Sequence, residues 1–289
     1  MRYEPIVKQD VHGMAVLPNL ADYETERLGF MWEDITRELG TSPDGAINIA
    51  YQAIDRHMET GTRDKVALYW EGSDGQKEVY TFQDLHRLTN RFANVLKGLG
   101  VTKGDRIFTY GDRIPEIYIS LIAGLKVGGV VGPLFSAFGP DAVKDRLGDC
   151  EASVLITTPK LAAIIREIVE DLPALRTIVI VNRKDLPYEM GQREVSYEAL
   201  MKDASDAFDR AQTDREDYAI IHYTSGTTGK PKGVVHVHQA VVGHFATAKY
   251  VLDLHPEDTY WCTADPGWVT GTSYGIFGPW SNGISPGGI

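Results

Sequence analysis

Short runs rich in Val, Ile and Leu alternate with longer runs of helical character between Arg106 and Val181. The short runs predict strands at residues 106–110, 130–134, 153–157 and 177–181, and the longer runs predict helices at 115–127, 140–149 and 159–169. Strands that are apolar on both sides and separated by helices usually pair in parallel, with helices on both faces of the sheet. The alternation therefore predicts an α/β fold with mostly parallel sheets flanked by helices.

Ahead of this region, residues 66–70 and 79–80 predict two strands around a turn at 72–75. Thr81 stands where a helix N-cap is expected, and Asp84, three residues later, completes an imperfect capping box. Apolar residues then recur every three or four positions as far as Leu99, which predicts one long helix with a buried stripe, closed by Gly100.

The N-terminal part of the chain carries less information. Residues 1–45 mix Pro, Gly and charged residues with little periodicity, and we expect an N-terminal extension in which Met31 and Trp32 form the one buried anchor. Residues 48–57 resemble a helix, and the trio Asp55, Arg56 and His57 at its end is interpreted as a solvated helix end rather than a catalytic cluster.

Composition narrows the class of protein. The 289 residues carry 29 Lys and Arg against 40 Asp and Glu, a formal charge of −11, which disfavours nucleic acid and anionic membrane surfaces as partners. Two cysteines, Cys150 and Cys262, are too few for a disulfide framework and fit a reducing compartment. No apolar run approaches the length of a membrane span, so we expect a cytoplasmic protein.

The strand predicted at residues 218–223 runs into an unusual loop that ends at Gly233. Glycines let several backbone N–H groups point at one anion, and hydroxyls and lysines add donors and positive charge. The loop therefore predicts a phosphate-binding site rather than a flexible surface turn. The spacing fits neither a Walker loop nor the G-x-G-x-x-G of dinucleotide-binding folds. The candidate phosphate-binding residues are Thr224, Ser225, Gly226, Thr227, Thr228, Gly229, Lys230 and Lys232.

The run from Tyr223 to Gly233 resembles the phosphate-loop signature of the adenylate-forming superfamily, which includes acyl-CoA synthetases, peptide-synthetase adenylation domains and luciferases. The resemblance implies that ATP, with Mg²⁺, activates a carboxylic acid to an acyl adenylate with release of pyrophosphate. In that family the loop holds the β- and γ-phosphates, and in its acyl-CoA synthetases the acyl group then passes to coenzyme A.

A second segment, residues 261–275, is dense in Trp, Gly and Thr, and it predicts a strand, a Gly/Pro turn and a helix start. By itself it fits a buried aromatic turn equally well. Its sequence is similar to that of the same segment in acetyl- and propionyl-CoA synthetases. This resemblance implies that Trp268, Val269 and Thr270 line the pocket for a short acyl group and CoA. Residues 132–138 resemble a segment near the CoA nucleotide, although Ser136-Ala137 replaces two glycines common there.

Four histidines near the loop, His222, His236, His238 and His244, suggest a metal cluster at first sight. Residues 236 and 238 share one face of a predicted strand, but neither a Cys nor a carboxylate stands at a ligand spacing. We therefore predict no metal site built by the protein.

The resemblance extends from about residue 45 to about residue 283, and residues 284–289 do not continue in the family's manner. We therefore expect residues 46–289 to form an incomplete N-terminal domain of the adenylate-forming fold, truncated before the small C-terminal domain and its catalytic lysine. We accordingly assign no catalytic residue in this chain and expect an exposed sheet edge, as in a partial gene product. Three functions remain open: a ligase for acetate or another short acid, a ligase for a longer acid, and a non-catalytic ATP-binding fragment.

Overall fold

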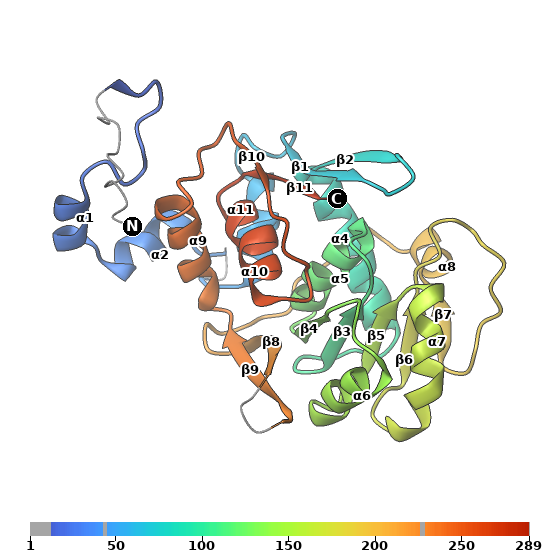
Figure 1. The fold of residues 1–289 in the computed structure, drawn as a ribbon. Coiled ribbons are helices and arrows are strands. Elements are labelled where there is room, and N and C mark those ends of the chain that lie inside the picture. The colour runs from blue at the N-terminus through green and yellow to red at the C-terminus, as the bar shows by residue number, and fades with distance from the viewer. Residues whose placement is uncertain (1–12, 43–44, 226–228, 289) are drawn as a thin grey trace, which may run out of the picture.

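The computed structural model describes residues 13–42, 45–225 and 229–288 of the chain, which form an α/β structure built on two sheets (Figure 1). The larger sheet has seven strands in the order β7-β6-β5-β3-β4-β8-β9. All neighbours in it are parallel except β8 and β9, which form an antiparallel hairpin. Its strands are β3 (Arg106–Tyr110), β4 (Val130–Leu134), β5 (Val154–Thr157), β6 (Thr177–Ile180), β7 (Glu194–Ser196), β8 (Tyr218–Ser225) and β9 (Pro231–Val237).

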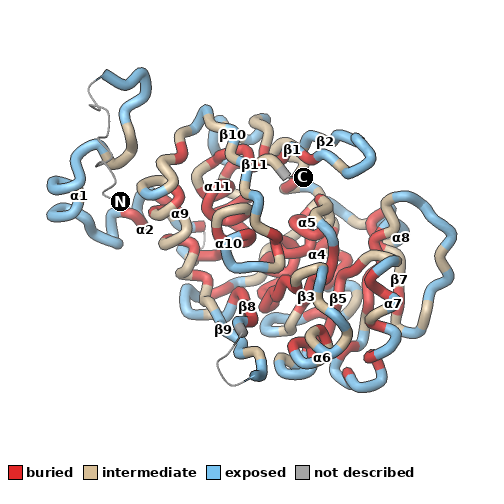
Figure 2. The backbone as a smooth tube through the Cα atoms, in the orientation of Figure 1, coloured by how far each residue is buried: buried red, intermediate tan, exposed pale blue. Residues whose placement is uncertain are grey.

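Helices cover both faces of this sheet, as the alternating apolar runs predict. Ile107 and Val131 point to a core shared with helices on one face, whereas Phe108 and Leu155 point to a core shared with helices on the other. The first face carries α3 (Ile49–Ala53), α4 (Phe82–Gly98), α5 (Pro115–Lys126), α8 (Tyr197–Lys202) and α9 (Ala240–Tyr250); the second carries α6 (Pro140–Asp149) and α7 (Pro159–Ile168). The buried strands between them form the interior of the molecule (Figure 2).

The smaller sheet has the order β10-β11-β1-β2 and contains β1 (Val66–Glu71), β2 (Lys77–Thr81), β10 (Thr259–Trp261) and β11 (Ser285–Gly288). The β1–β2 hairpin was predicted from the sequence, but β11 was not, because its Ser-Pro-Gly-Gly composition is unfavourable for a strand. It nevertheless pairs in parallel with both β10 and β1. These backbone hydrogen bonds to two neighbouring strands hold β11 in an extended conformation, although its own composition favours a turn.

Helix α4 begins as its sequence predicts. The Thr81 hydroxyl accepts a hydrogen bond from the Asp84 backbone N–H, and the Asp84 carboxylate accepts one from the Thr81 backbone N–H, so that the capping box is complete. Buried residues of α4, Phe82, Leu85 and Phe92 among them, form the predicted stripe.

Two expectations about the N-terminal region were wrong. Met31 and Trp32 are not a buried anchor, because each is more than half exposed, at the start of α2 (Trp32–Leu39). Ile35 and Leu39 form the buried face of that helix instead, against α9. Helix α1 (Tyr23–Gly29) precedes it and buries no residue.

The trio at residues 55–57 is not a solvated helix end either. It belongs to a 3₁₀ helix (Asp55–Met58) in which His57 is buried. The Asp55 carboxylate lies 2.5 Å from the Nζ atom of the fully buried Lys126, which also donates to Asn90. His86 and Lys126 hold the pKa of Asp55 below its usual value although burial opposes its ionisation. This buried pair ties the 3₁₀ helix to α5.

Among the described residues, no helix combines the length and apolar character that a bilayer span requires.

Candidate functional site

The topology of the larger sheet indicates where a ligand would bind. The strands β4-β3-β5-β6-β7 have the 2-1-3-4-5 order of a doubly wound sheet, whose ligands bind beyond the carboxyl ends of the strands, near the point where the order reverses. Here that point lies between β3 and β5. Because β8 is parallel to β4, its carboxyl end reaches the same edge of the sheet. The sequence motifs are therefore brought to the edge at which ligands are expected.

The candidate phosphate loop connects β8 to β9. Thr224 pairs with Lys232 and Ser225 with Pro231, so that the loop is the tip of a hairpin. Gly229 has a φ of +90°, in the region that favours glycine. Residues Gly226, Thr227 and Thr228 lie outside the described part of the chain.

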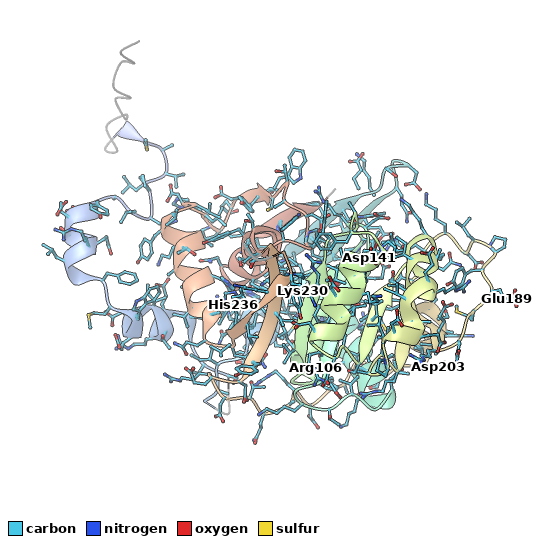
Figure 3. All side chains as sticks on the ribbon, turned by 60° about the horizontal axis from the view of Figure 1, so that its bottom comes forward. Arg106, Asp141, Glu189, Asp203, Lys230 and His236 are labelled. Atoms are coloured by element: carbon cyan, nitrogen blue, oxygen red, sulfur yellow. The ribbon has the colours of Figure 1, made fainter. Side chains whose placement is uncertain are left out.

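Both lysines of the loop are exposed to solvent, and within the described residues neither makes an ion pair. Figure 3 labels Lys230, which directly precedes β9, and Asp141, at the start of α6; β9 and α6 contact each other. Two unpaired cations beside a glycine with positive φ suit an anionic ligand such as a polyphosphate.

At the end of β8, immediately before the loop, side chains contact helices on both faces of the sheet. The Tyr223 hydroxyl donates to the Asp149 carboxylate, 2.7 Å away at the end of α6. His222 points to the opposite face, where its Nε2 atom lies 2.8 Å from the Thr272 Oγ1 atom. The base of the loop is thus fixed on both sides.

The second sequence motif folds as a turn followed by a helix. The turn begins at Asp265, whose carboxylate accepts a hydrogen bond from the Gly267 backbone N–H at 2.8 Å. Helix α10 (Val269–Thr272) starts directly after Trp268 and runs into a π-helix (Ser273–Phe277) and then α11 (Gly278–Ser281). π-Helical turns are rare and occur frequently at functional sites.

This turn packs against the segment at residues 132–138, so two motifs that are distant in sequence meet. A Cβ atom on Gly267 would lie 2.4 Å from the Phe135 backbone, which leaves room only for glycine. The Trp268 ring centroid lies 5.5 Å from that of Phe135 and 6.1 Å from that of Phe138. Trp268 nevertheless stays 45% exposed, with one side available to a ligand. Val269 and Thr270 are also exposed.

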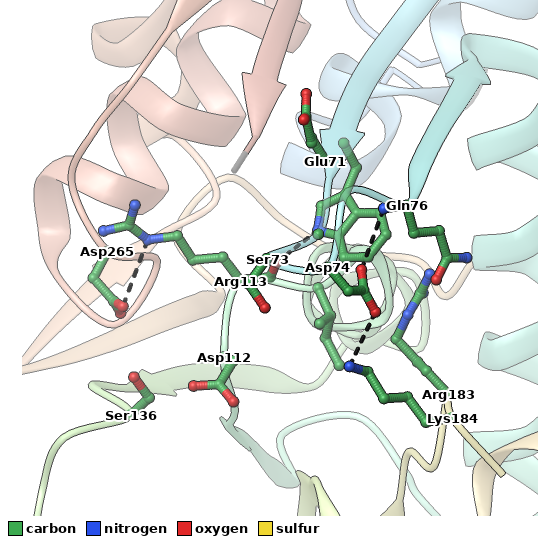
Figure 4. A pocket seen from close by; sticks show the side chains of 13 residues that line it. Glu71, Ser73, Asp74, Gln76, Asp112, Arg113, Ser136, Arg183, Lys184 and Asp265 are labelled. Carbon is green, nitrogen blue, oxygen red and sulfur yellow. Dashed lines mark hydrogen bonds and ion pairs between the residues drawn. The ribbon is translucent and has the colours of Figure 1, made fainter.

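A cleft of about 580 Å³ opens beside this aromatic cluster (Figure 4). The loops after β3, β4 and β6 contribute to its walls, together with the β1–β2 turn and Asp265. Its lining residues are Trp70, Glu71, Gly72, Ser73, Asp74, Gln76, Asp112, Arg113, Ile114, Ser136, Arg183, Lys184 and Asp265. The cleft therefore occupies the carboxyl edge of the sheet and includes Ser136 of the segment predicted near CoA.

The cations of the cleft are already paired, unlike those of the loop. Arg113 lies 3.8 Å from the Asp265 carboxylate and Lys184 lies 3.0 Å from that of Asp74. Burial raises the pKa of Asp265, and Arg113 partly offsets this effect. An anionic ligand in the cleft would have to compete with these carboxylates, whereas a ligand at the loop would not.

Arg183 forms the back of the cleft and is held by three groups. Its guanidinium bonds to the carboxylates of Glu78 and Glu116 and stacks over the Trp70 ring at 4.4 Å. Arg183, Trp70 and Arg113 were not predicted from the sequence as cleft residues. Arg113 and Arg183 each stand three residues after a buried strand, which was a signal, whereas Trp70 lies within a hairpin strand and offered none.

The histidines near the loop are buried to different extents and do not form a metal centre. The rings of His222 and His236 are 5.7 Å apart, and His244 stacks on Phe277. Burial lowers the pKa of His222, His238 and His244 to about 4 each. In the described part of the chain, no three His, Cys, Asp or Glu residues are arranged to hold a metal ion.

Known proteins resemble this chain over most of its length. A family model described as AMP-binding enzyme matches residues 54–287. The chain is 45% identical over 268 residues to the acetyl-coenzyme A synthetase of Bacillus subtilis, an alignment that covers 92% of this chain and 46% of that protein. It is 39% identical over 271 residues to the acetyl-coenzyme A synthetase of Rubrobacter xylanophilus, covering 88% of this chain and 42% of that protein.

A solved structure shows the same fold. The crystal structure of a Brucella canis acyl-CoA synthetase superimposes with a TM-score of 0.83 and 25% identity, covering 92% of this chain and 47% of that one. The chain thus spans less than half the length of the relatives it matches. The predicted α/β fold is confirmed, and the match over residues 54–287 establishes that the chain belongs to the AMP-binding enzyme family.

Proposed function

We propose that this chain is the ATP- and acyl-binding part of an AMP-forming ligase that joins acetate, or another short carboxylic acid, to coenzyme A. One observation carries the proposal. The hairpin loop with its unpaired lysines and the turn at Trp268 are linked through β8 in a chain that is 45% identical to an acetyl-coenzyme A synthetase. Residues 46–289 then form the incomplete N-terminal domain, and residues 1–45 an extension.

In this proposal the loop binds the β- and γ-phosphates of ATP. Lys230 and Lys232 supply positive charge, Gly229 allows the turn, and the hydroxyls of residues 224, 225, 227 and 228 supply donors. Mg²⁺ would enter with the nucleotide, because the described residues offer no metal site of their own. This chain's contribution is to bind and orient the phosphates.

The acid and coenzyme A would bind next to the aromatic cluster. Trp268 presents its exposed side to the acyl group and limits its length, and Val269 and Thr270 start the helix that borders it. The segment at residues 132–138, which Gly267 contacts closely, would guide CoA toward the acid. Since the carboxylates of the neighbouring cleft already pair its cations, we assign the ATP phosphates to the loop and not to the cleft.

The first test is a thermal melt of the 289-residue chain with and without MgATP. We expect a cooperative transition that MgATP raises, because a ligand that binds only the native state stabilises it. An unchanged transition at millimolar MgATP would contradict ATP binding by this chain. Acid-dependent exchange of pyrophosphate into ATP then separates an enzyme from a binding unit: binding without exchange identifies the third of the functions left open by the sequence.

A substitution tests whether the loop is the binding site for MgATP. Lys232→Ala should weaken MgATP binding by about tenfold or more, since a charge-assisted hydrogen bond contributes about 1.5–3 kcal/mol. Lys97→Ala, which removes an exposed lysine from α4, is the matched control and should leave binding unchanged. Equal affinities in the two variants would remove the loop from its assigned role.

A further inference from the structure

His222 occupies an unusual position between the two candidate binding elements. It lies on β8, four residues before the loop segment at 226–228, and is 95% buried. Its Nε2 atom contacts the Oγ1 atom of Thr272, fifty residues later in the sequence, at 2.8 Å. Among hydrogen bonds between described residues, this is the one that joins β8 to α10.

Thr272 also forms a hydrogen bond to the start of α10. Its hydroxyl is placed to donate to the Val269 carbonyl oxygen at 3.0 Å, and the Trp268 carbonyl lies 3.4 Å from the same oxygen atom. A hydroxyl has one proton, so a threonine that donates to Val269 must accept from His222. The imidazole is then the tautomer protonated at Nε2, with an unprotonated Nδ1.

The remaining ring atom of His222 fits this assignment. Nδ1 is buried without a hydrogen-bond partner among the described residues. In protein interiors, a donor without a partner is rarer than an acceptor without one. Burial also keeps the ring neutral, with its pKa lowered to about 4. His222 therefore acts as a fixed donor toward Thr272.

The helix that receives this bond is short, and its first residues are exposed. α10 has four residues and continues as a π-helix, whose hydrogen-bond geometry differs from that of an α-helix. Three of the residues at its start, Trp268, Val269 and Thr270, are exposed and contribute little burial energy. The contact from β8 therefore adds to the packing of Trp268 on Phe135 and Phe138 in setting their position.

We propose that His222 is a positioning residue that ties the Trp268–Thr270 segment to the strand leading into the phosphate loop. Through this hydrogen bond, the position of an acid bound at Trp268 is fixed relative to that of a phosphate bound at the loop. The positioning itself follows from the ligand-free structure, whereas its consequence for the two ligands rests on the proposed function.

The test is hydrogen exchange of the backbone amides of residues 268–277 in the full 289-residue chain, first without nucleotide. His222→Leu should speed exchange in this segment by about five- to tenfold, the effect of one lost buried hydrogen bond on local opening. His222→Gln, whose amide nitrogen can reach the place of Nε2, should restore most of the protection, and the shorter His222→Asn should not.

Tyr223→Phe is the matched control, since it removes one hydrogen bond of the same strand on the opposite face. Equal exchange in His222→Leu and Tyr223→Phe at residues 268–277 would overturn the proposal. If His222→Leu does not fold, Thr272→Val breaks the same bond from the other end and gives the same two outcomes.

Adding MgATP separates the tie from the proposed function. With both correct, MgATP slows exchange at residues 268–277 in the unmodified chain and has little effect there in His222→Leu. Absence of any MgATP effect on the melt of the unmodified chain would overturn the proposed function while leaving the nucleotide-free result in force. MgATP binding with equal slowing in both proteins would refute the coupling.

Discussion

Lowering the pH from 7 to 5 is expected to destabilise this protein steeply, because four buried histidines must stay neutral in the folded state. Burial lowers the pKa of His57, His222, His238 and His244 to about 4, against an ordinary value of 6.5. The His238 ring also accepts a hydrogen bond that protonation would break, because its Nδ1 atom accepts from the Ile49 backbone N–H.

The size of the effect follows from proton linkage. Between pH 6.5 and 4 the unfolded chain binds up to one more proton per histidine than the folded chain, so stability falls as the pH falls. Each unit of pKa difference is worth about 1.4 kcal/mol, which gives about 2 kcal/mol per histidine between pH 7 and 5 and about 8 kcal/mol for all four. That approaches the whole stability of an ordinary domain, about 5–15 kcal/mol. Glu116 and Asp265, whose pKa values burial raises, act in the opposite direction.

Urea unfolding at pH 7, 6 and 5, followed by circular dichroism, measures the slope directly. Replacing one buried histidine with a residue that does not titrate should lower that slope by about one quarter. His244→Gln and His57→Gln should do so equally, whatever each costs at pH 7. The reasoning fails if the free energy of unfolding changes by less than about 1 kcal/mol between pH 7 and 5, or if neither variant alters the slope.

Three further outcomes are expected. Lys126→Met should cost about 3–5 kcal/mol in urea unfolding because it leaves the Asp55 carboxylate, which is 14% exposed, with His86 but without its lysine partner, and the double variant with Asp55→Leu should recover much of the loss. Gly271→Ala should lower the melting temperature by several degrees, since its Cβ atom would lie 2.0 Å from the Asp265 carbonyl oxygen; an unchanged melt would show that the turn can move. Trp268→Gly in a full-length ligase should admit longer acids, and an unchanged chain-length profile would contradict its role in the pocket.

The parts of the fold that the sequence predicted are those in which local pattern and tertiary environment agree. The strands at 106–110 and 130–134 and the helix at 140–149 match the structure at both ends. β7 and β11 were not predicted, because three or four residues hold too little periodicity and their pairing depends on distant strands. The exposure of Trp32 was missed for a related reason, since a large apolar residue indicates burial only where another element packs on it.

In the candidate site, too, the features that depend on local sequence were predicted and those that depend on distant residues were not. The loop and the Trp268 turn are continuous segments whose composition carries their chemistry, so local motifs indicated them. Arg183 and Trp70 come from segments more than one hundred residues apart and meet only in the folded chain. Sequence patterns could not indicate their contact, nor that Asp55 would face Lys126 inside the protein.

The parallel pairing of β11 between β10 and β1 has a consequence for how the chain is made. β1 leaves the ribosome with only β2 to pair with, and the partner for its other edge is synthesised more than two hundred residues later. Throughout that interval one row of its backbone N–H and C=O groups remains available to any extended segment of the same or another chain. The larger sheet, whose parallel strands lie closer in sequence, is able to close first. The smaller sheet is therefore completed only when β11 has been synthesised, and until then its open edge can pair with neighbouring nascent chains.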